Sequence, residues 1–303
     1  MTKLTVVIVT WNTRALLEEC LESIRATTSD MDVETIVVDN ASTDGTREML
    51  SSRYPQTRLI VNDRNVGFAR ANNQAAMASD SEFLLLLNSD ARLLPRAASE
   101  MLRLTTEEPG AAIVGAQLLN PDGTFQASHS RFPGVFQEFL ILSGLGRLMR
   151  GRHFPSHGPE EGQGAQRVDY VEGACLLARR QAYLQVGGLD EGYFMYSEEV
   201  ELCYAMKRAG WDAWYQPTAR VVHLGGASSR QRATAREADL YRSRVRFFRR
   251  HHGPFQTALL KSMIYAITLG KQPLHAALRA LSGGRRGRTV VGWRELRASL
   301  RGV

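Results

Sequence analysis

The chain has 303 residues and a formal net charge of +7, with 44% hydrophobic and 23% charged residues. This composition is ordinary for a globular protein and excludes a mainly disordered, collagen-like or coiled-coil chain, and the length favours about two domains. No apolar run reaches the roughly 18 residues that a membrane-spanning helix needs. The longest candidate, 257–269, contains Lys261.

The basic residues are concentrated in the C-terminal part of the chain. Residues 229–303 contain 17 lysines and arginines against 3 acidic residues, which leaves 21 basic and 28 acidic residues in 1–228. An acidic body with a basic tail predicts an anionic partner for the tail. A phospholipid surface, a lipid-linked phosphate or a nucleic acid would each satisfy this expectation.

Cysteine usage and the N-terminus bear on the cellular compartment. Cys20, Cys175 and Cys203 have neither the number nor the spacing of a disulfide framework or a zinc site, and we expect Cys175 and Cys203 in the core. The first residues are too short for a signal peptide and lack a cleavage site. We therefore expect a cytoplasmic protein, with the basic tail allowing peripheral contact with the inner face of the plasma membrane.

Apolar runs alternate with helical spacings through the first 120 residues. Buried strands are predicted at Leu4–Val9, Thr35–Val38, Arg58–Val61, Phe83–Leu87 and Ala112–Val114. Helices are predicted at Thr13–Thr27, Ser42–Arg53 (capped by Ser42 or Thr43), Gly67–Ser79 and Leu94–Thr105. This strict alternation predicts a parallel sheet with helices on both faces.

The pattern loosens after Gly115. Residues 125–164 are rich in Gly, Pro, His and Ser and indicate loops with short helices near Phe136–Met149. Further elements are predicted in order as a strand at Val168–Leu177, a helix at Ser197–Ala209, and short strands at Ala213–Gln216 and Val221–His223. The tail is expected to be helical, with an amphipathic helix at Arg236–Arg250 and a break at Gly283-Gly284.

Polar residues follow the predicted strands, at the edge where open α/β sheets bind ligands. Thr10, Trp11 and Asn12 follow the first strand, and Asp39 and Asn40 follow the second. Trp11 could stack on a base and Asp39 could accept hydrogen bonds from a base or a ribose. Equally, Trp11 could be packing and Asp39 a helix cap. Neither a G-x-G-x-x-G turn nor a P-loop motif is present, so a dinucleotide cofactor and a P-loop are not expected.

Two further clusters of acidic and polar residues stand out. Asn88-Ser89-Asp90 follows a predicted central strand, where a carboxylate suits Mg²⁺ or Mn²⁺ bound to a diphosphate, although this triplet is also a common turn. Glu198, Glu199 and Glu201 crowd a predicted helix N-terminus, which the helix dipole alone would explain. The apolar residues 194–196 before them would raise a carboxylate pKa toward general-base use.

Seven motifs occur in an order that resembles the family 2 inverting glycosyltransferases of GT-A fold, especially the rhamnosyltransferase-like branch, over roughly residues 3–250. They are Val6-Val7-Ile8-Val9-Thr10-Trp11-Asn12, Val37-Val38-Asp39-Asn40-Ala41-Ser42-Thr43-Asp44-Gly45-Thr46, Asn65-Val66-Gly67-Phe68-Ala69-Arg70-Ala71-Asn72-Asn73, Leu86-Leu87-Asn88-Ser89-Asp90, Gly173-Ala174-Cys175, Gly187-Gly188-Leu189-Asp190-Glu191 and Val222-His223. The resemblance implies an α/β GT-A catalytic domain at 1–228, with a Rossmann-like, mostly parallel sheet flanked by helices, and a basic, mainly helical extension at 229–303.

The resemblance also implies roles for single residues. The nucleotide sugar would be bound by Thr10, Trp11, Asn12, Asp39, Asn40, Asp44, Gly67, Phe68, Asn72, Asn88 and Ser89. A divalent cation, Mg²⁺ or Mn²⁺, would be held by Asp90 and His223, unless His223 merely packs at a strand end. The catalytic base would be Glu199, where the family usually has Asp, with Glu198 as the alternative.

The implied reaction moves a sugar from a nucleotide diphosphate donor to an acceptor hydroxyl in one inverting displacement. The first candidate donor is dTDP-L-rhamnose, and the expected acceptor is a cell-surface polysaccharide or a lipid-linked glycan. The arginine-rich tail would lie on an anionic membrane or be a solvated helix on the catalytic domain. Two alternatives are a catalytically inactive nucleotide-sugar binder and a nucleic-acid-binding protein. Nucleic acid is not an expected partner, because no RNP or zinc-finger motif is present.

Overall fold

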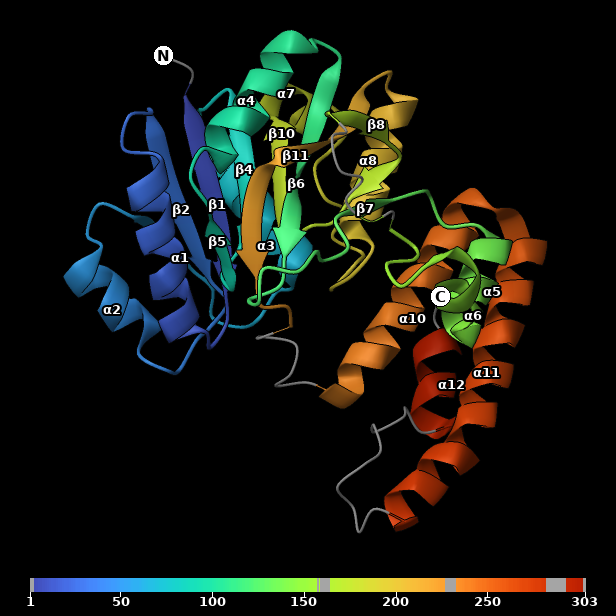
Figure 1. Cartoon of the computed structure of the whole chain (residues 1–303). Helices are drawn as coiled ribbons and strands as arrows, with labels where there is room; N and C mark the ends of the chain where they lie inside the picture. The colour runs from blue at the N-terminus through green and yellow to red at the C-terminus, as the bar shows by residue number, and fades with distance from the viewer. Residues whose placement is uncertain (1–2, 157, 159–163, 227–232, 282–292, 302–303) are drawn as a thin grey trace. The chain divides into compact units, whose positions relative to one another are not determined.

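The computed structural model describes residues 3–156, 158, 164–226, 233–281 and 293–301 (Figure 1). The chain divides into two compact units. We call residues 1–132, 156–194 and 198–228 the sheet unit, and residues 133–155, 195–197 and 229–303 the helical unit. The expected break at Gly283-Gly284 and the tail residues Arg230 and Arg232 lie outside the described residues.

A nine-stranded sheet forms the centre of the sheet unit. Its first half is parallel, in the order β3 (Arg58–Val61), β2 (Val33–Asp39), β1 (Leu4–Thr10) and β4 (Phe83–Asn88). The order continues through β10 (Cys175–Arg179), β6 (Ala111–Leu119), β11 (Asp212–His223) and β5 (Ala91–Leu93). A two-stranded sheet pairs β7 (His129–Ser130) with β9 (Tyr170–Val171).

The second half of the sheet corrects two sequence expectations. The single strand expected at Val168–Leu177 is instead three short strands, β8 (Gln166–Val168), β9 and β10, and β10 runs antiparallel to both β4 and β6. The two strands expected at 213–216 and 221–223 are one strand, β11, whose register shifts between Gln216 and Arg220. Strict parallel alternation therefore fails here, because β10, β8 and β5 each pair with a neighbour in the antiparallel sense.

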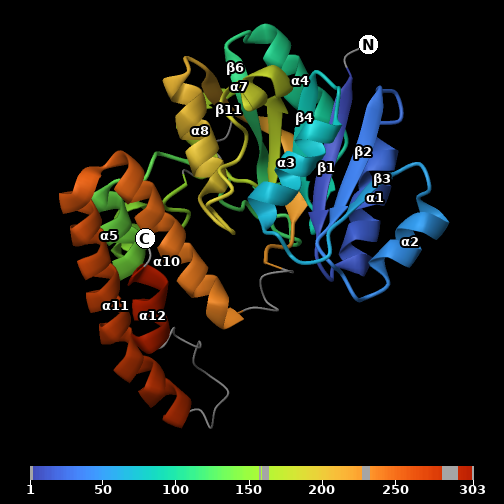
Figure 2. The same ribbon diagram turned by 180° about the vertical axis from the view of Figure 1, so that it is seen from behind.

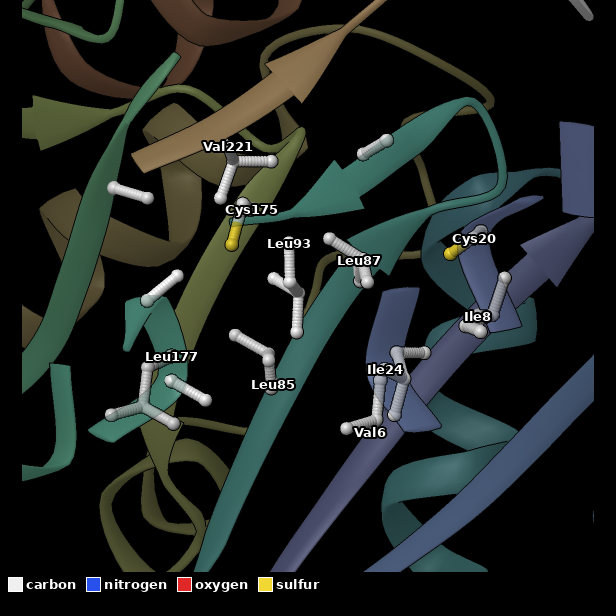
Figure 3. Close-up of a cluster of buried hydrophobic side chains, with 14 of the residues drawn as sticks. Val6, Ile8, Cys20, Ile24, Leu85, Leu87, Leu93, Cys175, Leu177 and Val221 are labelled. Carbon is white, nitrogen blue, oxygen red and sulfur yellow. The ribbon is translucent and has the colours of Figure 1, made fainter. Parts of the chain in front are cut away.

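Helices cover both faces of the sheet, because alternate strand residues point to opposite sides. Val6 and Ile8 belong to one buried cluster together with α1 (Arg14–Thr27), α2 (Thr46–Arg53) and α4 (Ala97–Glu107). Figure 3 shows part of this cluster, including the buried thiols of Cys20 and Cys175. The alanine-rich α3 (Phe68–Ala78) packs against β1 and β2, and Figure 2 shows it from the opposite side. The sheet unit also contains α7 (Arg180–Gln185) and α8 (Glu198–Arg208).

The helical unit comprises α5 (Val135–Ser143), α6 (Leu145–Arg150), α10 (Ala233–His251), α11 (Gly253–Leu281) and α12 (Trp293–Arg301). Its interior holds apolar side chains from α10, α11 and α12, including Phe247, Phe248, Leu260, Ile264 and Leu296. Inside it, an Arg244 guanidinium N–H donates to the buried Glu138 carboxylate of α5 at 2.6 Å. Within the described ranges, no helix is long and apolar enough to cross a membrane.

Candidate functional site

Strands β1, β2 and β4 end side by side and bring the predicted polar residues together. Thr10 at the end of β1 is paired with Asp39 at the end of β2, and Val9 is paired with Asn88 at the end of β4. Because the three strands are parallel, the segments that follow them leave from one edge of the sheet. Thr13 Oγ1 lies 2.9 Å from both Thr10 Oγ1 and Ser89 Oγ, a buried chain of hydroxyls that joins the ends of β1 and β4.

Asn12 joins the loop after β1 to the loop after β2. It has a left-handed backbone (φ 52°), its N–H donates to Ser42 Oγ at 2.9 Å, and its Oδ1 accepts from Thr43 N–H at 2.7 Å. Ser42 and Thr43 are therefore part of this loop, and the expectation that they cap a helix beginning at Ser42 was wrong. The helix begins at Thr46, after Gly45 in the left-handed region. Trp11, directly before Asn12 in the loop after β1, is half-buried.

Two carboxylates shape the loop after β2. Asp39 is fully buried and accepts from Ser42 N–H and, at 2.5 Å, from Arg47 Nε. Asp44 accepts from Arg14 N–H at 2.8 Å and from the Thr46 hydroxyl at 2.5 Å. Both groups thus have internal partners that hold the loop in shape at the sheet edge, and their contact with a nucleotide stays a prediction.

Asn40 and Gly67 join β2 to the start of α3. The Asn40 side-chain N–H₂ donates to the Gly67 carbonyl at 3.3 Å, and its Oδ1 accepts from Asn62 at 2.9 Å. Gly67 has a φ of 90°, and a Cβ at this position would lie 2.9 Å from the carbonyl oxygen of Phe194. That oxygen accepts from Phe68 N–H at 3.1 Å. A side chain at position 67 would therefore push apart two segments that are distant in sequence.

Asn72 and its neighbour Asn73 have different partners. Asn72 is buried and donates to the Phe68 carbonyl within α3, so its polar group is used inside the helix. Asn73, which the sequence analysis did not assign to the site, bonds both backbone groups of Leu189 and accepts from the Tyr183 hydroxyl at 2.6 Å. Asn73 therefore fixes the Gly187-Gly188-Leu189 turn against α3.

The two predicted metal ligands meet. Asp90 lies between β4 and β5, and His223 ends β11 opposite Ala91. Asp90 Oδ1 lies 3.3 Å from His223 Nε2, and the Asn88 side-chain nitrogen is also 3.3 Å from Nε2. Both Asp90 and His223 are largely buried. The structure therefore brings the carboxyl end of β4 and the end of β11 into one site.

Gln126 sets the protonation pattern of His223. The Gln126 side-chain N–H₂ donates to the His223 carbonyl at 3.2 Å, so its Oε1 must accept from the Nδ1–H of His223 at 2.6 Å. A neutral His223 then has its lone pair on Nε2, facing the Asp90 carboxylate. Two acceptors 3.3 Å apart suit a cation between them, so these residues fit a divalent metal ion. Among the described residues, no three His, Cys, Asp or Glu side chains form a metal set alone.

The three acidic residues at the start of α8 are not equivalent. Glu201 is buried and accepts from the Tyr193 hydroxyl at 3.0 Å, which gives it a structural partner. Glu198 is 6% exposed, and its Oε2 is buried without a hydrogen-bond partner in the part of the chain that the structure describes. Glu199 is half-buried and therefore more accessible. Its side chain lies beside Gly173, where a Cβ would be 3.5 Å from that of Glu199.

Burial and nearby negative charges raise the pKa values of the two candidate bases. Burial raises the pKa of Glu198 to about 7, with a further rise from the charge of Glu172. The pKa of Glu199 is raised well above its ordinary value by burial first, then by the charges of Glu198 and Glu172. Glu172 was not singled out from the sequence, because it is close to these acids only after β9 and α8 pack together. The three carboxylates form a site that can take up a proton near neutral pH.

The segment before these acids has an unusual backbone. Tyr196 (φ 73°) and Ser197 (φ 64°) are in the left-handed region, directly before Glu198. Such conformations in non-glycine residues are costly and are typical of functional sites. Met195 and Tyr196 belong to the helical unit, where the Ser243 hydroxyl donates to the Met195 carbonyl at 2.9 Å and Arg236 lies over the Tyr196 ring.

Known proteins that resemble this chain show its family. Residues 5–184 match the family described as Glycosyl transferase family 2. The chain is 31% identical over 276 residues to N-acetylglucosaminyl-diphospho-decaprenol L-rhamnosyltransferase of Mycobacterium tuberculosis, covering 85% of this chain and 88% of that protein. It is 26% identical to the O-antigen chain rhamnosyltransferase WbaN of Salmonella anatum, over 65% of this chain and 58% of that one. The chain belongs to glycosyl transferase family 2, in its rhamnosyltransferase-like branch.

Solved structures confirm the fold. The mannosyltransferase PcManGT from Pyrobaculum calidifontis, solved with GDP-Man and Mn²⁺, matches with a TM-score of 0.56 at 17% identity, covering 94% of this chain and 76% of that one. GalNAc-T7, solved with UDP, GalNAc and Mn²⁺, matches with a TM-score of 0.56 at 16% identity, covering 74% and 44%. The sheet unit therefore has the GT-A fold. Membership of glycosyl transferase family 2 makes the protein an enzyme that transfers a sugar.

Proposed function

We propose that this enzyme transfers L-rhamnose from dTDP-L-rhamnose to a hydroxyl of a lipid-linked glycan that serves as a precursor of a cell-surface polysaccharide. The single observation that carries the proposal is the meeting of Asp90 and His223, 3.3 Å apart, at the sheet edge where the polar loops after β1 and β2 also lie. Similarity to the mycobacterial rhamnosyltransferase along most of both chains supports rhamnose and a diphosphate-lipid acceptor.

The nucleotide sugar would lie across the carboxyl ends of β1, β2 and β4. Trp11 offers a half-buried aromatic face for a base, and the loop joined by Asn12 offers backbone and side-chain hydrogen-bonding groups. The donor would be contacted by Thr10, Trp11, Asn12, Asp39, Asn40, Asp44, Gly67, Phe68, Asn72, Asn88 and Ser89. Asp39, Asp44 and Asn72 would act mainly by holding their segments in place, since their polar atoms have partners within the protein.

Asp90 and His223 would hold a divalent cation, Mg²⁺ or Mn²⁺, beside the diphosphate. Both structural neighbours were solved with Mn²⁺, which supports this assignment. Bound there, the cation would neutralise charge that develops on the departing nucleoside diphosphate. Gln126 would orient His223 so that Nε2 faces the cation.

Glu199 would be the general base, because it is more accessible than Glu198 and has a raised pKa. It would accept the proton of the acceptor hydroxyl as that oxygen forms a bond to the anomeric carbon. The bond from the anomeric carbon to the diphosphate oxygen breaks at the same time, and the nucleoside diphosphate leaves from the opposite face. One displacement of this kind inverts the anomeric configuration. Glu198 would act as the coupled neighbour that shares the proton.

A lipid-linked acceptor would place the enzyme at the cytoplasmic face of the membrane, in peripheral contact with anionic lipid. The helical extension at 229–303, with 17 basic and 3 acidic residues, supports this contact. In this organisation residues 1–228 form the catalytic domain and residues 229–303 the extension.

A thermal-shift panel would test the donor class directly. The protein would be melted with dTDP, UDP or GDP, each with Mn²⁺ and with EDTA. Ligand at about 100 times its dissociation constant adds about 2.7 kcal/mol of stability, which corresponds to roughly 5–10 °C in Tm. We expect a metal-dependent shift with dTDP. A shift with GDP alone would contradict the proposed donor, and product stereochemistry with dTDP-L-rhamnose would test inversion.

A further inference from the structure

Exposed large hydrophobic side chains are concentrated in three helices of the helical unit. The described residues include ten such side chains, and eight of them belong to α5, α6 and α11. Leu148 is 84% exposed and Phe255 80% exposed. The eight, which we call the apolar patch, are Phe136, Phe139, Leu145, Leu148, Met149, Phe255, Leu259 and Leu269.

The solvent-facing side of α11 has no charge over four turns. At 100° per residue, the exposed positions between 255 and 270 fall within an arc of about 120°. Leu260, Ile264 and Thr268 on the opposite side are buried. A helix that packs one face in a soluble protein normally carries charged residues on its other face. The exposed positions between 255 and 270 are Phe255, Ala258, Leu259, Ser262, Ala266, Leu269 and Gly270.

Helix α5 lies beside this part of α11, and α6 packs against α5. His252, directly before α11, is hydrogen-bonded through Nε2 to the carbonyl of Pro133, two residues before α5, at 2.8 Å. Helix α5 packs against both α11 and α6, and Figures 1 and 2 show α5 beside α11 from opposite directions. The exposed side chains of the two chain segments therefore belong to one region of the helical unit.

The region around the patch is basic. The sequence contains no Asp or Glu between Asp239 and Glu295. The only acid in residues 133–155 is Glu138, which is buried and paired with Arg244. Leu148 and Met149 stand between the exposed Arg147 and Arg150 in α6. Exposed apolar side chains with arginines on either side are typical of segments that lie in an anionic membrane interface.

We propose that the apolar patch is the membrane-docking surface of this protein: its side chains enter the acyl boundary of an anionic phospholipid bilayer while the neighbouring arginines bind lipid phosphates. The inference identifies which surface makes the membrane contact proposed above, and it rests on that proposed contact. It also assigns docking to α5 and α6, outside the basic tail that the sequence indicated. Pairing with a second copy is disfavoured, because two patches without exposed acids would bring arginines against arginines.

Vesicle sedimentation of the full chain, without nucleotide sugar, tests the surface. The vesicles would be phosphatidylcholine alone, or phosphatidylcholine with 30% phosphatidylglycerol. We expect binding to the anionic vesicles that weakens with salt. The triple substitution L148S/M149S/F255S should lower the partition constant at least tenfold. R147Q/R150Q should lower it roughly fivefold for each arginine. The matched control M77S/V61S replaces exposed apolar residues of the sheet unit and should bind like the unchanged protein.

Three outcomes would overturn the inference. They are no binding to either vesicle, an equal loss in M77S/V61S, and a dimer in light scattering that L148S/M149S/F255S dissociates. Circular dichroism and melting of each variant establish that it is folded. Sugar transfer to a water-soluble acceptor, measured without vesicles, tests the proposed function independently of membrane binding. A triple variant that keeps transfer but loses vesicle binding supports the patch, whereas an unchanged protein that binds vesicles but transfers nothing contradicts only the proposed reaction.

Discussion

Asp90 and His223 lie 3.3 Å apart at the ends of segments that are far apart in the chain, and Gln126 fixes which nitrogen of His223 faces the carboxylate. The pairing of β11 with β5 creates this contact, because it places His223 opposite Ala91, the residue after Asp90. Directly beyond this strand pairing, Leu224 N–H donates to the Asp90 carbonyl at 3.1 Å. The relationship is therefore set by the pairing of two strands in the sheet.

Replacing Gln126 by alanine should weaken metal binding without removing a ligand. Loss of the bond to Nδ1 frees the His223 tautomer and ring orientation, and second-shell changes of this kind cost about 10–100-fold in metal affinity. The measurement is the Mn²⁺ concentration that half-saturates transfer. Gln185→Ala, which removes a bond to Trp211 elsewhere, is the control and should leave this concentration unchanged. An unchanged value in Gln126→Ala would contradict the role of His223 as a ligand.

Glu199→Gln should lower kcat by about 10²–10⁴-fold, which is the usual contribution of a general base. The amide keeps the size of the side chain but cannot accept the proton. Single-turnover transfer with each substitution distinguishes the two candidates, with Glu198→Gln expected to have the smaller effect. A loss below tenfold in Glu199→Gln together with a large loss in Glu198→Gln would assign the base to Glu198.

The raised pKa values predict opposite pH trends for activity and stability. A base must be ionised, so kcat/KM should rise with pH over a range higher than an ordinary glutamate would give, because burial raises the pKa of Glu199 well above its usual value. In the folded state these carboxyls bind protons more tightly than in the unfolded state. For Glu198, whose pKa is raised to about 7, this contribution to stability is complete below about pH 4.5 and is lost as pH rises through about 7.

Thermal melting of Glu198→Gln measures the stability trend, since its amide does not ionise. Its Tm relative to the unchanged protein should increase from pH 4.5 to pH 8. The control is Glu108→Gln, a change at an acid outside the site. A difference in Tm that is the same at both pH values would show that Glu198 has an ordinary pKa.

Gly67→Ala should destabilise the protein and raise the KM for the donor. The substitution combines a φ of 90° with a Cβ only 2.9 Å from the Phe194 carbonyl oxygen. Gly123→Ala is a matched control, because Gly123 also has a positive φ (81°) but has no atom within 4 Å of its Cβ position. Left-handed backbone alone costs roughly 1–2 kcal/mol for a residue with a Cβ. A larger loss of Tm in Gly67→Ala is expected from the contact with Phe194 together with the φ 90°, ψ 170° backbone, which only glycine adopts readily. Equal losses would contradict this expectation.

The ion pair inside the helical unit gives a prediction about stability. Glu138→Leu leaves the Arg244 charge without its partner, and breaking a buried pair in this way costs about 3–5 kcal/mol. The double substitution Glu138→Leu with Arg244→Met should recover most of that loss, because it removes both charges. Chemical denaturation of the two variants measures the difference. If the double variant were no more stable than the single one, the pair would not be the source of the effect.

The sequence was sufficient for the fold class and the first half of the sheet. The GT-A fold is confirmed, and β3 was predicted at its observed bounds because apolar runs bounded by polar segments are local signals. The second half was less predictable. Short strands such as β10 acquire their direction from neighbours far along the chain, and β5 has only three residues.

The candidate site shows the same division between local and long-range information. Thr10, Asp39 and Asn88 could be placed at one edge from strand ends alone. Gln126 and Glu172 could not, because a glutamine in a loop and a single glutamate have no local pattern that reports their partners. Their proximity to His223 and to Glu199 follows from packing between segments that the sequence leaves unconnected.

The hydrogen bond from Phe68 N–H to the Phe194 carbonyl has a consequence for changing the enzyme's substrate. Gly67 belongs to the segment beside the expected sugar donor, and Phe194 belongs to the segment that leads to the acids of α8. The two segments pack so closely that a Cβ on Gly67 would collide with Phe194. A chimera that takes residues 65–68 from a relative but keeps 190–194 would combine two surfaces that were not selected together. Donor preference is therefore best exchanged as a pair of segments, one from each side of this contact.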